Sequence, residues 1–221
     1  MTSNLIPVIA IDGPTASGKG TVAQRIADTL GFHYLDSGSL YRLVALAAVR
    51  AGIDHDNETG LATLAAGLDV RFVDGHIWLS GQEVTNDIRT EMVSQNASRV
   101  ASLPKVRAAL LQRQRNFRRP PGLVCDGRDM GSVVFPDATA KFFLTASVEA
   151  RAERRTKQLN EKGMSAIMTD VVKELRARDE RDSSRPVAPL KHFSDAYLID
   201  TTDISADLAV DKILGQYHKM N

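Results

Sequence analysis

The stretch Gly13-Pro14-Thr15-Ala16-Ser17-Gly18-Lys19-Gly20-Thr21 decides the fold of this chain. It has the spacing G-x-x-x-x-G-K of a phosphate-binding loop, with the hydroxyl residue displaced by one position to Thr21. The apolar segment 6–11 before it predicts a buried strand. After it, Val22, Ile26 and Leu30 form one face of a predicted helix that Gly31 ends. Strand, glycine-rich loop and helix in this order are the context that the motif requires.

The residue types in this loop suit an anionic ligand. Glycine at 13 and 18 permits backbone conformations that a side chain disfavours, so the loop N–H groups and the helix N-terminus face the anion. Lys19 is expected to reach the β- and γ-phosphates of a nucleotide, and Thr21 to reach Mg²⁺ through its hydroxyl or a water. The alternative is a turn without a ligand, in which Lys19 would have little structural role. The predicted nucleotide-binding residues are Gly13, Pro14, Thr15, Ala16, Ser17, Gly18, Lys19, Gly20 and Thr21.

Composition limits the classes of function. The 221 residues suit one α/β domain with insertions. The net charge of +1 gives no overall attraction to nucleic acids or acidic membranes, and no apolar run approaches the ~18 residues of a membrane span. Cys125 is the only cysteine, which excludes an internal disulfide and favours a reducing compartment. We expect a cytoplasmic monomer that binds neither nucleic acid nor membrane.

Polar residues follow two further predicted strands, 32–35 and 123–126. Ligands of an open parallel sheet bind beyond the carboxyl ends of its strands. Asp36 and Ser37 lie at the first of these ends; the alternative for Ser37 is that it, or Ser39, only caps the next helix. Asp126 and Asp129 lie at the second end, and either could organise Mg²⁺. Capping a turn is the alternative for Asp126.

The middle of the chain predicts an insert. Segments 68–73, 76–80 and 83–84 read as short antiparallel strands, with Asp74-Gly75 as a hairpin turn and Trp78 packed inside the sheet. Helices are expected at 86–101 and from Pro104 to about 117. Basic residues are dense between 99 and 119, but most are expected on a solvated face, and interleaved aromatic residues typical of a single-stranded nucleic-acid groove are missing.

The last third of the chain predicts two more strands, at 140–145 and 197–200, and three helices. Two of these helices, from Ser147 to 159 and from 165 to about 181, form a hairpin whose arginines are mostly expected in surface ion pairs. The exception is the cluster of Arg178, Arg181 and Arg185 with two aspartates, which suggests an anion site. The closing helix carries an apolar stripe that includes Ala209, Ile213 and Tyr217.

These motifs together resemble the bacterial cytidylate kinases, a branch of the nucleoside monophosphate kinases, over nearly the full chain. The resemblance rests on the loop 13–21, on Leu35-Asp36-Ser37-Gly38-Ser39-Leu40-Tyr41-Arg42, on Asp126-Gly127-Arg128-Asp129-Met130-Gly131, and on Arg178-Asp179-Glu180-Arg181-Asp182 with Arg185. It implies a three-layer α/β P-loop kinase fold with a central parallel sheet, a small antiparallel insert and a helical lid. Residues 1–221 would form a single domain, with the monophosphate-binding region at 37–102, its β insert at 68–84 and the lid at 151–182.

The resemblance also implies a reaction: transfer of the γ-phosphoryl group of Mg-ATP to CMP or dCMP, giving ADP and CDP or dCDP, in pyrimidine metabolism. Ser98 and Asp129 would bind the base edge, the arginines the phosphate, and Asp182 the sugar. The residues that match monophosphate-binding positions, with Asp36 beside them, are Asp36, Ser37, Arg42, Ser98, Arg107, Arg128, Asp129, Asp182 and Arg185. The predicted catalytic set is Lys19, Arg128, Asp129, Arg154 and Arg178, with the last two as lid residues that contact the transferring phosphate.

One departure from the family pattern lies in the phosphate-binding loop. This chain has Thr15-Ala16-Ser17 where relatives often carry Ser-Gly-Ala. We expect the loss of a loop glycine to be tolerated if Ala16 keeps a negative φ.

The chemistry requires no general base. The attacking phosphate has a second pKa of about 6 and is largely anionic at neutral pH. Cations and in-line geometry are what the reaction needs, and lid closure would exclude water.

The sequence disfavours three other functions. A small-metabolite kinase such as a shikimate kinase is disfavoured by the β insert and the chain length. A GTP-dependent switch is disfavoured because the sequence has no Asn-Lys-x-Asp motif. An inactive nucleotide-binding scaffold would leave the arginine and aspartate sites without a purpose. Residue types alone leave cytosine, uracil and adenine open as the base, and only the resemblance favours cytosine.

Overall fold

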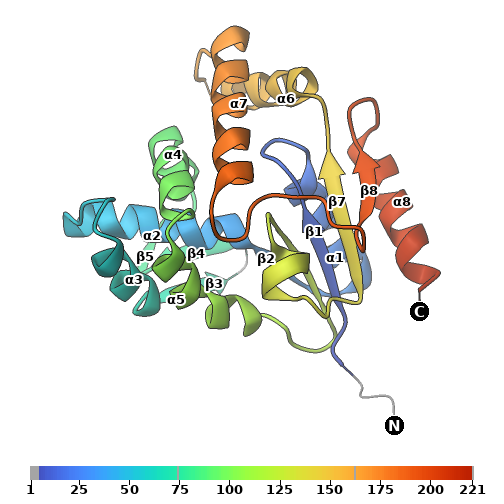
Figure 1. Ribbon diagram of the computed structural model, residues 1–221, viewed down its shortest axis with the longest axis horizontal. Helices are drawn as coiled ribbons and strands as arrows, with labels where there is room; N and C mark the ends of the chain where they lie inside the picture. The colour runs from blue at the N-terminus through green and yellow to red at the C-terminus, as the bar shows by residue number, and fades with distance from the viewer. Residues whose placement is uncertain (1–4, 74, 162, 221) are drawn as a thin grey trace. The chain divides into compact units, whose positions relative to one another are not determined.

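The computed structural model describes residues 5–73, 75–161 and 163–220. The chain forms two compact units, whose helices and strands are labelled in Figure 1. The first unit combines the segment up to Leu35 with the segment from Phe117 onward, and the second unit is Asp36–Asn116. Each unit is described by itself below.

The first unit is built on a five-stranded sheet with the order β2-β6-β1-β7-β8. β1 pairs in parallel with β6 and with β7, and β7 pairs in parallel with β8. The predicted central parallel sheet is therefore confirmed. Its central strand brings Asp12 into register with Gly127 of β6 and Phe143 of β7, so the three carboxyl ends lie together. The strands are β1 (Val8–Asp12), β2 (His33–Asp36), β6 (Leu123–Gly127), β7 (Ala140–Thr145) and β8 (Tyr197–Asp200).

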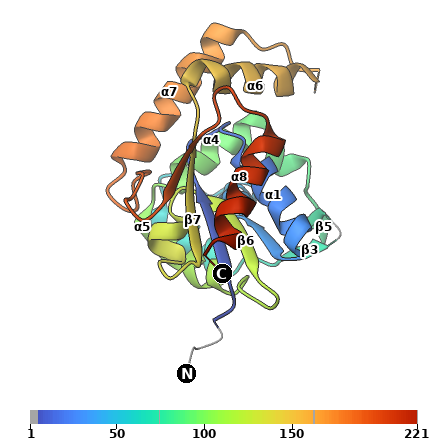
Figure 2. The same cartoon turned by 90° about the vertical axis from the view of Figure 1, so that its right-hand side faces the viewer.

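Two helices from opposite ends of the chain pack together against this sheet. Figure 2 shows α1 (Lys19–Leu30) and α8 (Ala206–His218) side by side. Their predicted apolar faces are confirmed, because Val22, Ile26, Ala209, Val210, Ile213 and Tyr217 share one buried cluster with strand residues such as Ile9, Ile11 and Phe142. Gly31 ends α1 in the left-handed conformation, as predicted, at a φ of 65°.

The predicted helical hairpin is also present in the first unit. Helices α6 (Val148–Glu161) and α7 (Met168–Ser184) pack through Ala152, Val171 and Leu175. The Ser147 hydroxyl accepts a hydrogen bond from the N–H of Ala150 at 3.2 Å, which confirms its capping role. Helix α7 begins later than the sequence predicts. Lys162, expected to end the first helix together with Gly163, lies outside the described residues.

The second unit combines four helices with the predicted antiparallel insert. The helices are α2 (Ser37–Ala51), α3 (Glu58–Ala66), α4 (Glu91–Val100) and α5 (Pro104–Arg115). The sheet has the order β3-β4-β5, formed by Val70–Val73, His76–Leu79 and Gln82–Glu83. Asp74 of the predicted hairpin turn lies outside the described residues. Ile77 and Leu79 form the buried face of β4, and Trp78, expected inside this sheet, is only half-buried.

Three local features of the second unit differ from the sequence predictions. Asp36, and not Ser37 or Ser39, caps α2, because its carboxylate accepts from the N–H of Ser39 at 3.2 Å. The predicted helix 86–101 is broken at Thr90, whose extended conformation separates a short 3-10 turn, Asp87–Arg89, from α4. Helix α3 was not predicted; Asn57 caps it by accepting from Gly60 N–H at 2.9 Å.

No helix within the described ranges has the length and apolarity needed to cross a membrane.

Candidate nucleotide-binding site

The loop between β1 and α1 has the backbone geometry of an anion site. Gly18 precedes α1 in the left-handed conformation, with a φ of 88°, and no side chain among the described residues caps this helix. The first N–H groups of an α-helix have no partner within the helix, so they remain available to an anion. At Gly13 a Cβ would lie 2.0 Å from the carbonyl oxygen of Leu144 in β7, so the loop follows the sheet more closely than any side chain allows.

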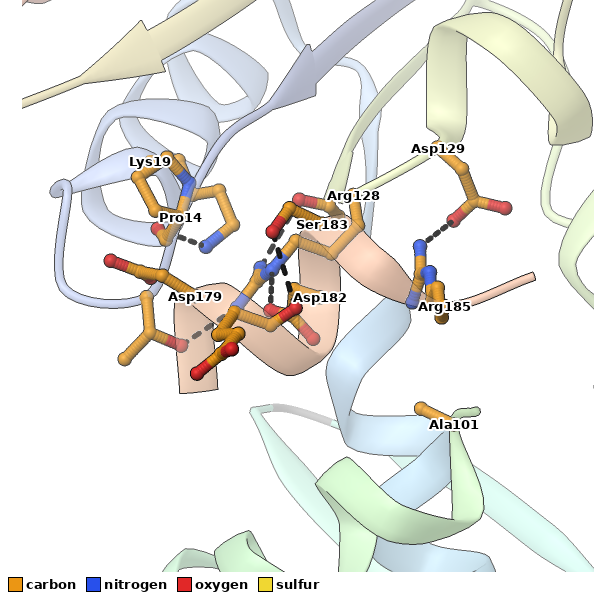
Figure 3. Close-up of polar contacts among 12 residues, drawn as sticks. Pro14, Lys19, Ala101, Arg128, Asp129, Asp179, Asp182, Ser183 and Arg185 are labelled. Carbon is orange, nitrogen blue, oxygen red and sulfur yellow. Dashed lines mark hydrogen bonds and ion pairs between the residues drawn. The ribbon is translucent and has the colours of Figure 1, made fainter. Parts of the chain in front are cut away.

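Lys19 lies over this loop. Its ammonium donates a hydrogen bond to the Pro14 carbonyl at 3.2 Å, as Figure 3 shows. The side chain is half-buried, which places the charge beside the helix N-terminus rather than in bulk solvent. A phosphate held by the loop would meet both the helix N–H groups and this cation.

Ala16 corrects one expectation from the sequence. Its φ is 61°, so the condition on which we expected the loss of a loop glycine to be tolerated, a negative φ, is not met. A left-handed residue with a Cβ costs about 1–2 kcal/mol. The Ala16 side chain packs against the lid cluster of Ala152, Val171 and Leu175. Burial of this methyl group offsets part of the backbone cost.

Arg128 connects the phosphate-binding loop to the lid helix α7. Its Nε donates to Asp182 Oδ2 at 2.7 Å, and its Nη2 donates to Thr15 Oγ1 at 2.7 Å. Figure 3 shows the pair formed by Arg128 and Asp182. Burial raises the pKa of Asp182, but the charge and hydrogen bond of Arg128, with the charges of Arg178 and Arg185, outweigh it and hold this pKa below its usual value. Asp182 is therefore a buried carboxylate that stays ionised at neutral pH.

Two lid arginines hold α6 close to the nucleotide loop. Arg151 is buried, forms a two-point ion pair with Asp179 at 3.0 and 2.6 Å, and donates to the Thr15 carbonyl at 3.3 Å. The expectation of a surface ion pair is wrong for this residue. Arg154 donates to Thr201 Oγ1 at 3.1 Å and to the carbonyls of Thr201 and Thr202. The Thr201 hydroxyl in turn donates to the Ser17 carbonyl at 2.9 Å.

A second cluster surrounds Asp129. This residue and Arg185 are both buried and form an ion pair at 3.8 Å, which Figure 3 shows. Arg185 also donates from Nε to the carbonyl of Ala188. The structure thus brings together the predicted residues Arg128, Asp129, Arg178, Asp182 and Arg185 with the loop 13–21, all within the first unit.

Asp126 lies beside the phosphate-binding loop. It accepts a hydrogen bond from the Tyr34 hydroxyl at 2.7 Å, and a Cβ built on Gly20 would lie 4.0 Å from its Oδ1. A carboxylate next to the loop suits Mg²⁺, which prefers oxygen ligands and is commonly held by one or two carboxylates, phosphates and water. Asp129, the other candidate, faces Arg185 instead. The geometry therefore favours Asp126, with Thr21 as the exposed hydroxyl of the same loop.

The remaining predicted residues belong to the second unit. Ser37 and Arg42 lie on α2, Ser98 on α4 and Arg107 on α5. Arg107 is buried, donates to the Ala101 carbonyl at 3.1 Å and lies 5.7 Å from the ring centroid of Tyr41. Ser98 is buried too, and its hydroxyl has no hydrogen-bond partner among the described residues. A buried hydroxyl without a partner is costly, so it is a natural group for a ligand to satisfy.

Comparison with known proteins identifies the family. The family model described as cytidylate kinase matches residues 9–219. The chain belongs to the cytidylate kinase family. A cytidylate kinase of Chromobacterium violaceum is 61% identical over 97% of this chain and 96% of its own length. A cytidylate kinase of Cupriavidus necator is 58% identical over 95% of this chain and 95% of its own length. One of Nitrosomonas europaea is 54% identical over 98% of this chain and 97% of its own length.

A solved structure from Eubacterium ventriosum, described as an uncharacterized protein, shares the fold alone. It has a TM-score of 0.53 and 12% identity, and the match covers 96% of this chain and 98% of that one. The fold class predicted from the sequence is confirmed by the parallel sheet, the antiparallel insert and the helical hairpin.

The sequence analysis of this cytidylate kinase family member did not predict three residues that lie at the site. Asp12 ends β1 and accepts hydrogen bonds from Met130 and Gly131 N–H, both at 2.9 Å. Arg151 and Thr201 tie the lid and the β8 end to the loop. Asp12 could have been predicted, because an acidic residue at the end of β1 directly precedes Gly13. Arg151 and Thr201 could not, because their hydrogen-bond partners are distant in the sequence.

Asp12 should make the stability of the protein depend on pH. Burial raises its pKa to about 7, with repulsion from Asp129 adding to the rise and the two N–H groups and Arg128 opposing it. Folding therefore favours the protonated form, and this contribution to stability is lost as pH rises from about 4 to about 7. We expect the free energy of unfolding of the wild type to fall by up to about 4 kcal/mol over that window, relative to Asp12→Asn. Urea unfolding of both proteins at a series of pH values measures this; parallel curves would contradict it. Asp182 titrates below this window.

Proposed function

We propose that this protein is a cytidylate kinase that transfers the γ-phosphoryl group of ATP to CMP or dCMP, giving ADP and CDP or dCDP. The family match over residues 9–219 carries this proposal. The geometry agrees with it, because a phosphate-binding loop and buried arginine–aspartate pairs meet within one unit. A kinase of this type needs cations that bring two anions together.

The proposed roles follow from the chemistry of each side chain. The loop 13–21 binds the ATP phosphates, and Lys19 neutralises charge that develops on the transferring group. Mg²⁺, held by Asp126 and the Thr21 hydroxyl, would supply further charge neutralisation when it is bound. Arg128 and Arg185 bind the acceptor phosphate, and Asp182, kept ionised by Arg128, accepts hydrogen bonds from the sugar.

The second unit supplies the other proposed acceptor contacts. Arg42 and Arg107 would bind the monophosphate, and the Ser98 hydroxyl would bind the base edge, with Asp129 as the other base contact. Ser37, with Asp36 before it, lies at the start of α2, where helix N–H groups favour an anion. The lid arginines Arg154 and Arg178 would approach the transferring phosphate on lid closure, which requires Arg154 to leave Thr201 and Thr202. The proposal treats residues 1–221 as one functional domain with 37–102 as the monophosphate-binding region and 151–182 as the lid.

The acceptor specificity tests the proposal. ADP release from Mg-ATP is measured with CMP, dCMP, UMP, AMP or shikimate offered separately, and in a blank without acceptor. We expect fast release with CMP and dCMP. Release with AMP or shikimate alone would refute the base assignment while leaving the phosphate-binding loop in place.

Arg185→Ala should weaken binding of the monophosphate more than binding of ATP. The variant removes a buried guanidinium that pairs with Asp129, so both the acceptor phosphate and this carboxylate lose a cation. A charge-assisted hydrogen bond contributes about 1.5–3 kcal/mol, so the dissociation constant for CMP should rise about tenfold or more. Calorimetric titrations with CMP and with ATP, each offered alone, measure both constants. Arg25→Ala, on the exposed face of α1, is the control. Equal losses for the two nucleotides would contradict the assigned role.

A further inference from the structure

Asp12 reaches from the central strand to the turn that follows Asp129. It is the last residue of β1 and only 9% exposed. Its Oδ1 accepts from Met130 N–H and its Oδ2 accepts from Gly131 N–H, each at 2.9 Å. Both carboxylate oxygens therefore bind successive backbone groups of the π-helical turn Met130–Val134. These contacts join segments 118 and 119 residues apart in the sequence.

The turn depends on this carboxylate because its own N-cap residue does not bind it. The first N–H groups of a helical turn lack partners within the turn. The Asp129 side chain makes no capping hydrogen bond there, and it pairs with Arg185 instead. Asp12 thus caps this turn from the central strand β1, in place of the N-cap residue of the turn.

The turn is also packed tightly against the sheet. A Cβ on Gly131 would lie 3.2 Å from two side-chain carbons of Lys141 and 3.5 Å from Cβ of Ala10. Met130 is fully buried. With its first two N–H groups held by Asp12 and Met130 buried, the turn has a fixed starting point, and Arg128 and Asp129 directly precede that point.

We propose that Asp12 is a positioning residue for monophosphate binding: its carboxylate holds the backbone of Met130 and Gly131, and so fixes Arg128 and Asp129 in the conformation that binds the acceptor nucleotide. This inference rests on the proposed function. It assigns Asp12 no contact with either nucleotide. Because Asp12 is also the residue before Gly13, one side chain fixes the ends of both nucleotide-binding loops relative to each other.

The charge state of Asp12 gives this role a signature. The titratable groups around it are Cys125 and Asp126 on β6, Arg128 and Asp129 after that strand, and Lys141, Lys191 and Asp195, which line the same pocket. Burial raises the pKa of Asp12 to about 7, so protonation occurs near neutral pH. A protonated carboxyl has one acceptor oxygen fewer for the two N–H groups, so the turn is held less firmly below this pH.

Asp12→Asn tests the inference because it keeps the size of the side chain but turns an NH₂ group toward one of the two N–H donors. We expect KM for CMP to rise about tenfold at about pH 8, with KM for ATP changed by less than about threefold. The KM of the wild type for CMP, divided by the KM of Asp12→Asn for CMP, should rise as pH falls through about 7. Using the ratio cancels the titration of CMP itself, whose phosphate has a second pKa of about 6.

Asp195→Asn is the matched control. It removes a carboxylate from the same pocket, but this carboxylate is exposed and pairs with Lys141, so the KM values of the variant should match those of the wild type. Equal rises in both KM values for Asp12→Asn would overturn the inference, because they would indicate general damage to the phosphate-binding loop. Unchanged KM values would overturn it as well.

A measurement on the wild type keeps the test independent of whether the variant folds. The amide ¹H shifts of Met130 and Gly131 are followed by NMR across the same pH range, without nucleotide. We expect both to titrate together with a midpoint near 7, and flat shifts would overturn the inference. A wild type that does not phosphorylate CMP would refute the proposed function instead, whatever these two amides do.

Discussion

Lys19→Ala is expected to lower kcat with CMP and Mg-ATP at least about a hundredfold, because it removes a cation that stabilises the transferring phosphate. Lys19 lies at the N-terminus of α1 and donates to the Pro14 carbonyl at 3.2 Å, so its charge is already oriented over the loop. An oriented cation costs no reorganisation during the reaction, which is why its removal acts on turnover.

Steady-state kinetics of the purified variant measures the effect, with thermal unfolding as evidence that it is folded. Lys212→Ala, on an exposed position of α8, is the matched control and should keep wild-type turnover. A folded Lys19→Ala variant with a kcat within about fivefold of the wild type would refute the assigned role.

Gly13→Ala is expected to disrupt both the phosphate-binding loop and the fold around it. The added Cβ would lie 2.0 Å from the Leu144 carbonyl oxygen and 3.1 Å from its carbon, and these are backbone atoms of a central strand that cannot rotate away. Gly13 also has a φ of 155°. Overpacking of this kind costs about 3 kcal/mol or more, and the displaced loop should lose most of its affinity for ATP.

Urea unfolding and calorimetric titration with ATP measure the two effects. Gly215→Ala in α8 is the control, since a Cβ there would meet no atom within 4 Å. Alanine in a helix interior is favoured over glycine, so this control should gain up to about 1 kcal/mol. A Gly13→Ala protein as stable as the wild type, with unchanged ATP affinity, would contradict the close approach of loop and sheet.

The parts of the fold that follow from local pattern were predictable. The apolar strand before Gly13, the face of Val22 and Ile26, and the Gly31 C-cap each depend on residues within a few positions of one another, and all three are confirmed. The antiparallel insert was equally visible, because Ile77 and Leu79 recur at the spacing of two residues typical of a strand, directly after a turn signal. Local pattern was sufficient for these features, although it missed α3, whose Asn57 cap is also local.

The errors arose where a distant segment decided the conformation. Ala16 takes a positive φ that a loop alanine alone would avoid, and it packs against a lid cluster from residues more than a hundred positions away. Arg151 reads as a surface lid residue, yet Asp179 and the Thr15 carbonyl bury it. Helix α2 shows a smaller error of another kind, since the capping residue lay one position earlier than the serines suggested.

The candidate site was predicted unevenly for the same reason. Motifs identified Lys19, Arg128, Asp129 and Asp182, because these residues lie in short segments with characteristic spacing. The hydrogen bonds that hold them were invisible in the sequence, since Asp12, Thr201 and their partners meet only after the sheet forms. Asp12 and Ala16 each carry a cost in stability at the nucleotide-binding loop. For Ala16 the cost is a positive φ, and for Asp12 it is the burial of an ionisable carboxyl group.

Direct detection of the transferred group tests the central claim. ATP labelled with ³²P in the γ position is incubated with CMP, Mg²⁺ and the protein, and the nucleotides are separated by anion exchange. We predict that the label appears in CDP, with inorganic phosphate at the level of a reaction without protein. Label that accumulates in inorganic phosphate, with none in CDP, would identify an ATPase and contradict the proposal that this family member phosphorylates CMP.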